Sequence, residues 1–428
     1  MALAAVLLLA GAALLTEWWR GTGTSAAAVV TGAALGSAAV LAASQLPRRG
    51  PLPYALVAAI FIAAWLAVDL ALGWTGDQDP HQVYRSEGQA LLDGRAPHAE
   101  YPAGAILLFA LETALGGGSP VVPNAVAMAL CAVFTTLMLA HVDDTRDDWL
   151  SLAAALSPAA LFFVLFRFDA AATVLVPAGL LASIRGRWAL AGIALGAGAA
   201  VKWTPALALV PLLVWLIRRD RRSGLVLGGA ALASFVLLNV PLFVLDPGSI
   251  LSPYRLQSGR GVTGESIWAL PLAALGRLDR TPAFWVSGVA PHWVDTLAVG
   301  VQLVLLIGLS IWAARAQTVR SAAAVAALAP VLLLLSNKIF SAQFLVPIAA
   351  CILFAVAATA GSPTLRVSVV LLLTVAAAAD GLVYPFRLGS FFDDVWPASL
   401  VFFAAALGAV ACAVVSIRAD RVAPLAPT

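Results

Sequence analysis

The stretch GLVLGGAALASFVLLNVPLFVL, residues 224–245, contains no charged side chain. As an α-helix, 22 residues would extend about 33 Å, and the hydrocarbon core of a bilayer is about 30 Å thick. The stretch lacks the strict alternation of apolar and polar residues that marks a half-buried strand. We therefore predict a membrane-spanning helix here.

The composition of the chain extends this prediction to the whole sequence. Hydrophobic residues make up 62% and charged residues only 11%, whereas soluble domains carry about 25% charged residues, and the mean hydropathy is +0.96. In lipid, every backbone polar group must be paired inside the protein, and runs without alternation favour helices over a barrel. The apolar runs lie at 2–19, 25–45, 54–73, 104–116, 121–140, 150–166, 170–184, 188–201, 204–217, 224–245, 293–314, 320–335, 343–359, 366–384 and 397–417. We predict an all-α polytopic membrane protein with a single transmembrane domain over residues 1–428.

Several classes of protein are disfavoured by the same sequence. Cys131, Cys351 and Cys412 all lie in apolar runs, where a thiol behaves as a small hydrophobe, so neither a disulfide framework nor a metal site is expected. The net charge is only +3 and the basic residues are scattered, which argues against a nucleic-acid partner. Residues 1–15 lack a basic leader and a second apolar run follows at once, so we expect a retained helix instead of a signal peptide.

Lys and Arg gather in short turns, which the positive-inside rule places in the cytoplasm. These turns contain Arg48, Arg49, Arg185, Arg187, Arg218, Arg219, Arg221, Arg222, Arg315, Arg320, Arg418 and Arg421. Counting spans from each terminus agrees only if one segment between 104 and 140 does not cross. We assign the short run 104–116, which ends in three glycines, as a re-entrant or partly inserted helix. About 13–14 transmembrane helices result, with both termini in the cytoplasm.

Two hydrophilic stretches, 74–103 and 246–292, are long enough to carry chemistry. The predicted topology places both outside the cytoplasm, together with nearly every charge that is not in a basic turn. Charges at membrane depth are costly and usually mark a water-filled cavity or a substrate path. We therefore expect an active face on the extracytoplasmic side of the plasma membrane.

The first of these loops combines carboxylates, aromatic residues and a glycine turn. Its motifs are Asp77, Asp79, Tyr84-Arg85, Glu87, Leu91-Leu92-Asp93-Gly94 and Glu100-Tyr101-Pro102. A carboxylate beside an apolar wall can act as a general base. The alternative is that these acidic residues are simply solvated.

Isolated cations recur beside aromatic residues at the predicted outer helix ends. They stand in Arg167-Phe168-Asp169, Lys202-Trp203-Thr204-Pro205, Lys338-Ile339-Phe340 and Tyr384-Pro385-Phe386-Arg387. Each alone could be an interfacial anchor, and a lone lysine can extend its ammonium to the headgroups. Together they suit a phosphate-bearing lipid.

These motifs resemble glycosyltransferase family 87, whose members are polyprenyl-phosphate-mannose-dependent mannosyltransferases of the GT-C superfamily, found mainly in actinobacteria. The resemblance covers about residues 50–400. It rests on the first-loop Asp, Tyr84-Arg85, Glu100-Tyr101-Pro102, Lys202-x-Thr204-Pro205 and the segment from Lys338 to Phe344. It implies a GT-C helical bundle with helices in the extracytoplasmic loops, and an inverting transfer that needs no nucleotide. We expect no cofactor and assign no metal ligands, while the sequence leaves metal dependence open.

The resemblance implies the base, and the cations at the predicted outer helix ends suggest the residues that bind the donor. The base is an Asp at the start of the first loop, for which we favour Asp79 over Asp77 because Asp79 is nearer Tyr84. The donor phosphate would be bound by Lys202, Lys338, Arg167, Arg387 and, from the second loop, Arg260. The sugar and the acceptor would be bound by Tyr84, Glu87, Glu100, Tyr101, Asp169 and Gln343.

The expected partners are a polyprenyl-phosphate sugar donor, a glycolipid or glycan acceptor of the cell envelope, and the lipid bilayer. The transferred sugar is mannose or, less favoured, arabinose. A lipid-linked sugar flippase or transporter is the main alternative, and it predicts polar residues spread through both leaflets or an internal repeat. A scaffold without activity would leave the cations and carboxylates unexplained.

Overall fold

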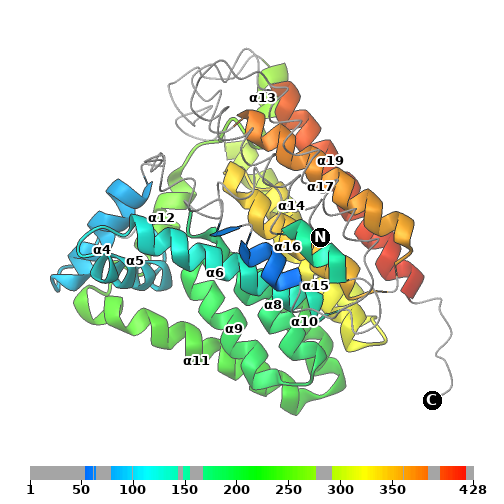
Figure 1. Cartoon of the computed structure of the whole chain (residues 1–428), viewed down its shortest axis with the longest axis horizontal. Coiled ribbons are helices and arrows are strands. Elements are labelled where there is room, and N and C mark those ends of the chain that lie inside the picture. The colour runs from blue at the N-terminus through cyan, green and yellow to red at the C-terminus, as the bar shows by residue number, and fades with distance from the viewer. Residues whose placement is uncertain are drawn as a thin grey trace.

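A computed structural model describes most of the chain, and its elements are drawn in Figure 1. The residues described are 54–60, 62–63, 79–98, 100–142, 148–154, 167–275, 292–359, 361–383 and 396–420. The predicted runs 2–19 and 25–45 lie outside them, as do Asp77 and Arg387 of the candidate site.

The described residues form helices and connecting turns, which confirms the predicted all-α class. The elements are η1 (Pro80–Tyr84), α4 (Arg85–Leu92), α5 (Ala103–Leu115), α6 (Val121–Ala140), η2 (Asp148–Ala154), α8 (Asp169–Ile184), α9 (Trp188–Val201), α10 (Thr204–Arg219), α11 (Arg221–Leu245), α12 (Ser252–Gly259), α13 (Ala269–Ala274), α14 (His292–Ala314), α15 (Val319–Leu335), η3 (Ala342–Phe344), α16 (Leu345–Ala357), α17 (Pro363–Val383) and α19 (Trp396–Asp420).

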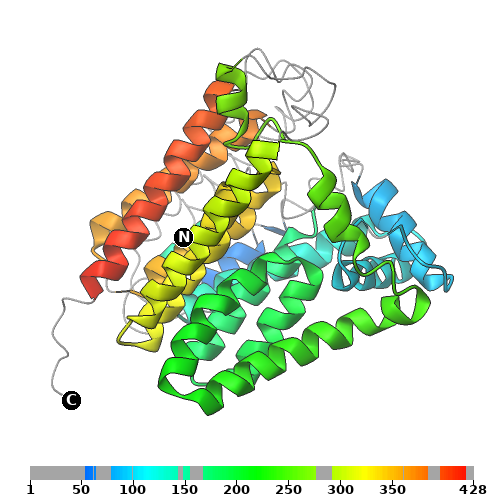
Figure 2. The same ribbon diagram turned by 180° about the vertical axis from the view of Figure 1, so that it is seen from behind.

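Five of the described helices are long and apolar enough to cross a bilayer. Their spans are Val121–Ala140, Arg221–Leu245, His292–Ala314, Pro363–Gly381 and Ala398–Ala419. The chain is therefore a polytopic membrane protein. Two of the shorter apolar helices, α15 and α16, pack inside the bundle: nearly every residue of α15 and every residue of α16 is buried, as expected for a helix that is hydrophobic on all sides. By contrast, only 17% of the span in α14 is buried, and Figure 2 shows this helix on the surface of the bundle.

Helix boundaries follow the apolar runs except where a side chain caps the backbone. The runs 121–140 and 188–201 coincide with α6 and α9. Helix α11 begins before its apolar run because an oxygen of Asp220 accepts hydrogen bonds from the backbone N–H groups of Arg222 and Ser223, at 3.1 and 3.2 Å. The two arginines assigned to a turn, Arg221 and Arg222, therefore lie in the first turn of α11.

Successive helices run antiparallel, so the bundle has two chemically different ends. At one, which we call the polar end, acidic and basic residues mix: Asp169, Lys202, Asp295, Lys338 and Asp380 lie there. At the other, which we call the basic end, most charged residues are arginines, among them Arg185, Arg218, Arg315, Arg366 and Arg418. Helices α17 and α19 run side by side along one edge of the bundle and α11 lies along the opposite edge (Figure 1).

Helix α5 differs from its neighbours in length and position. It has 13 residues, about 20 Å of helix, and it begins against the polar end of α9, where Gly104 leaves no room for a Cβ beside the backbone of Ala200 and Val201. Helix α6, which follows, ends at the basic end, where Arg320 donates to the carbonyl of Val142 at 2.6 Å. That α5 does not cross the membrane stays a prediction.

Helices α9 and α11 pack closely through glycines. A Cβ on Gly196 would meet the carbonyl oxygen of Ala231 and the hydroxyl of Ser234, whereas one on Gly229 would meet nothing within 4 Å. Small residues at such contacts let helix backbones approach in a membrane protein.

We therefore expect Gly196→Ala to lower the melting temperature of the purified protein, because overpacking a tight contact costs about 1–3 kcal/mol. The matched control Gly229→Ala should leave it unchanged or raise it, since Ala is the better helix former by about 1 kcal/mol. Thermal unfolding in detergent measures both. A Gly196→Ala protein as stable as the parent would contradict the close approach of α9 and α11.

Candidate functional site

An aromatic cluster forms the apolar wall of the site at the polar end. Tyr84 stacks on Phe109 with ring centroids 4.1 Å apart, and both rings meet Phe168 edge-on, at 5.8 and 5.3 Å. Tyr101 completes the cluster, 5.0 Å from Phe168. Edge-to-face and offset contacts of this kind add to the energy of burial. The cluster holds the first loop against the start of α8.

Asp79 lies at the edge of this cluster. It stands at the N-cap position of η1, and its carboxylate forms an ion pair with Arg167, which precedes α8. The Tyr101 hydroxyl lies 3.5 Å from the same carboxylate. The Asp79 side chain remains 25% exposed, so it is held in place yet can be reached from outside the fold.

Asp169 and Lys202 form a more deeply buried pair, 2.5 Å apart. Lys202 ends α9 in an extended conformation, and its ammonium lies 5.2 Å from the ring centroid of Phe168 and 4.7 Å from that of Phe344. Asp169 lies in the first turn of α8, where the helix dipole favours a negative charge. Its side chain is only 1% exposed, so the lysine compensates a charge that would otherwise be costly.

Glu265 belongs to the same site, although the sequence did not single it out. It is buried, accepts a hydrogen bond from the backbone N–H of Ala342, and interacts with the charge of Arg167. Burial raises the pKa of Glu265 to about 8, against the opposing effects of that hydrogen bond and of Arg167. Asp380 of α17 is also buried and close enough to interact with Glu265. The one sequence signal was a lone carboxylate in an otherwise uncharged part of the second loop.

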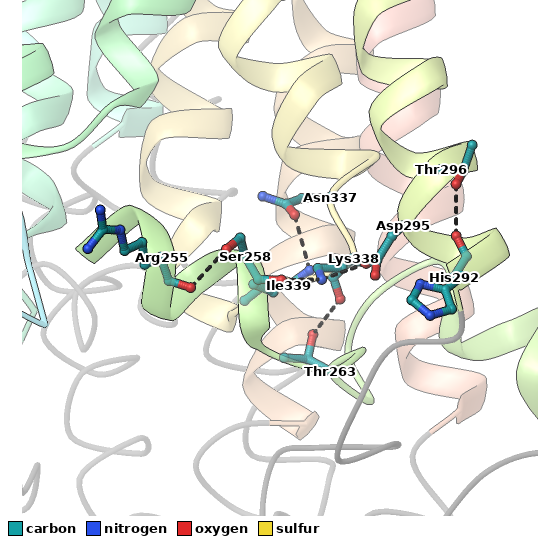
Figure 3. Close-up of polar contacts among 9 residues, drawn as sticks. All are labelled: Arg255, Ser258, Thr263, His292, Asp295, Thr296, Asn337, Lys338 and Ile339. Carbon is teal, nitrogen blue, oxygen red and sulfur yellow. Dashed lines mark hydrogen bonds and ion pairs between the residues drawn. The ribbon is translucent and has the colours of Figure 1, made fainter. Parts of the chain in front are cut away.

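Lys338 fixes the second loop to the bundle, as Figure 3 shows. Its ammonium donates to Asp295 at 2.6 Å and to the carbonyl of Ser258 at 3.1 Å. Its own carbonyl accepts the backbone N–H of Thr263 at 3.1 Å. The Thr263 hydroxyl donates to the carbonyl of Phe340 at 2.8 Å. These bonds bring Glu265, two residues further on, into the site.

Arg260 links the two loops directly. Its guanidinium lies 2.5 Å from the carboxylate of Glu100, and the backbone N–H of Glu100 lies 3.5 Å from the carboxylate of Glu87. Glu87 is buried on α4. These two glutamates therefore have a structural contact each, in addition to any role toward a sugar.

The structure brings six of the predicted residues into one cluster: Asp79, Tyr84, Tyr101, Arg167, Asp169 and Lys202. Gln343 is half-buried next to Phe344, which contacts Lys202. Arg260 belongs to the second loop and pairs with Glu100 of the first, whereas Lys338 contacts the second loop at Ser258 and Thr263. Four cations, Arg167, Lys202, Arg260 and Lys338, each pair with a carboxylate, and these pairings were not predicted from the sequence. A donor phosphate would therefore have to share or displace these carboxylates, and convergence on one phosphate pocket stays a prediction.

No protein-family model matches the chain, and no curated protein sequence matches it closely enough to be called a relative.

The burial of Asp169 gives a stability prediction. Lys202→Met should lower stability by about 3–5 kcal/mol, because it leaves an uncompensated buried carboxylate. Adding Asp169→Asn should restore most of the loss. Arg95→Met is the control, since Arg95 pairs with Asp93 on an exposed surface and surface pairs contribute little.

Thermal unfolding of the four proteins in one detergent measures these effects. If Lys202→Met alone melts with the parent, the pair does not hold α8 and α9 together. If the double variant is no more stable than Lys202→Met, the loss comes from a contact other than the ion pair.

Proposed function

We propose that the chain is a membrane glycosyltransferase of the GT-C type. It moves mannose, or arabinose, from a polyprenyl-phosphate donor to a hydroxyl of a cell-envelope glycan or glycolipid, on the extracytoplasmic face of the plasma membrane. The observation that carries this proposal is Asp79: a partly exposed carboxylate, paired with Arg167, at the polar end of a membrane bundle and beside an aromatic wall.

The proposed reaction is an inverting displacement at the anomeric carbon. The oxygen of the acceptor hydroxyl attacks the anomeric carbon while Asp79 removes the proton of that hydroxyl. The bond between the anomeric carbon and the phosphate oxygen breaks, and its electron pair stays on the phosphate. The polyprenyl phosphate leaves as an anion, so the protein must supply a base and cations, and no nucleotide is involved. The Arg167 guanidinium offsets the charge of Asp79 while that carboxylate is ionised.

The remaining residues of the cluster fit supporting roles. The half-buried ring of Tyr101 offers an apolar surface and a hydroxyl beside Asp79, which suits a sugar ring with its mixed faces. Arg167 pairs with Asp79 and Lys202 pairs with Asp169 of the same cluster, and both cations are assigned to the departing phosphate. Burial raises the pKa of Glu265 to about 8, so its carboxyl group is mostly protonated below that pH. The protonated group can donate a hydrogen bond to a sugar oxygen.

A lipid-linked sugar transporter is the second candidate, favoured by a different observation. Glu112 is buried in α5, and neither of its carboxylate oxygens has a hydrogen-bond partner among the described residues. Ionisable groups inside membrane helices often belong to transport paths. The two candidates differ in product, because only the transferase forms a new glycosidic bond.

The test is radiolabelled transfer in isolated membranes, with polyprenyl-phosphate-mannose offered against polyprenyl-phosphate-arabinose. Asp79→Asn keeps the shape of the side chain but removes the base, so transfer should fall by about 10²–10⁴-fold while donor binding persists. Asp93→Asn is the matched control, because Asp93 lies on the exposed end of α4. It should retain parental activity.

Three outcomes decide the proposal. Loss of transfer in Asp79→Asn alone supports it. Normal transfer in Asp79→Asn together with loss in Asp77→Asn would give the role of base to Asp77. Normal transfer in both variants, or movement of labelled lipid across the membrane without a new glycosidic bond, would overturn the enzyme assignment.

A further inference from the structure

A groove lies between α10 and α14. It reaches the basic end of the bundle, whereas the candidate site lies at the polar end. The groove has a volume of about 510 Å³. Most of the lining residues are apolar, and two arginines lie at one end of the groove. The lining residues are Val210, Val214, Arg218, Leu306, Ile307, Ser310, Ile311, Ala314 and Arg315. The Ser310 hydroxyl donates its proton to the carbonyl of Leu306 at 2.7 Å, so it does not donate to a ligand in the groove.

The groove opens toward lipid. Ile307 is 58% exposed and Ile311 is 47% exposed, and α14 is the least buried of the candidate spans. In a bilayer, these side chains face hydrocarbon and not water. The apolar part of the groove therefore suits an acyl chain.

The two arginines add a charge requirement. Arg218 is in the last turn of α10 and Arg315 directly follows α14; both are exposed. Neither guanidinium pairs with a carboxylate in the described part of the chain. The nearest acidic residue in sequence, Asp220, is bonded to the backbone of Arg222 and Ser223 as the cap of α11. The open end of the groove is thus positively charged.

We propose that this groove binds a bilayer lipid with an anionic phosphate headgroup. One acyl chain lies along Val210, Val214, Ile307 and Ile311, and the phosphate is bound between Arg218 and Arg315. The arginines stand at the basic end, which the positive-inside rule assigns to the cytoplasm, and the cytoplasmic leaflet carries the anionic lipids that attract such residues. A zwitterionic lipid would bring its own cation toward the arginines and bind less well.

Such a lipid would join two helices that both lead to the candidate site. At the polar end, α10 begins two residues after Lys202, and α14 carries Asp295, which pairs with Lys338. The lipid would therefore stabilise the spacing of α10 and α14 from the far end. This inference does not depend on the proposed reaction.

The experiment measures lipid binding to the purified, delipidated full-length protein by native mass spectrometry. The probes are phosphatidylglycerol and phosphatidylcholine with the same acyl chains. The Arg218→Gln/Arg315→Gln variant should bind phosphatidylglycerol more weakly by about fivefold for each arginine. The matched control is Arg221→Gln/Arg222→Gln, which removes two exposed arginines of the same end outside the groove and should bind as the parent does.

A second variant, Ile307→Trp, fills the groove without changing its charge. It should reduce binding of both lipids. The proposal is supported if the arginine pair changes the preference for phosphatidylglycerol and Ile307→Trp reduces both. It is overturned if Arg221→Gln/Arg222→Gln has the same effect as Arg218→Gln/Arg315→Gln, if Ile307→Trp binds as the parent does, or if the parent does not distinguish the two lipids.

Discussion

A charge inside a membrane protein has to be compensated, and at the polar end of this bundle carboxylates do so. In low dielectric, an unpaired charge costs several kcal/mol, and this cost applies most directly to Lys202 and Asp169, the most deeply buried pair. The pairs are Arg167 with Asp79, Lys202 with Asp169, Arg260 with Glu100 and Lys338 with Asp295. Each joins separate elements, and together they fix both long loops to the helix ends. The candidate site results from this compensation.

The two ends of the bundle divide the chemistry between them. The polar end mixes acids and bases around aromatic rings, the environment that a group-transfer reaction on a charged lipid requires. The basic end carries arginines that hydrogen-bond to backbone carbonyls, as Arg320 does to Val142, or that extend toward the surface, as Arg218 and Arg315 do. A lipid substrate and a lipid ligand are thus proposed for opposite ends, and the helices α10 and α14 connect them.

The lengths of the apolar runs were enough to predict the long helices, because the apolar character of each residue can be read directly from the sequence. Helices α6 and α9 begin and end where their apolar runs do. Contacts between distant residues could not be predicted in the same way. Arg260 and Glu100 are 160 residues apart, and nothing local to either residue indicates the other. Glu265 was expected on the extracytoplasmic face but was not predicted as a site residue, since its place in the site comes from Arg167 and Ala342, which only the fold brings close. The start of α11 was predicted too late because Arg221 and Arg222 were assigned to a basic turn, whereas the Asp220 side chain caps the helix just before them.

We propose that the polar end, with Asp79, faces away from the cytoplasm. This orientation can be tested with single cysteines in a chain whose Cys131, Cys351 and Cys412 are replaced by Ala. Arg95 is exposed near the candidate site, its side chain 67% accessible, and Arg221 is exposed at the basic end. A membrane-impermeant maleimide added to intact cells should label Arg95→Cys at once and Arg221→Cys only after the cytoplasmic face is opened. Labelling in the reverse order would contradict the orientation and, with it, the extracytoplasmic site.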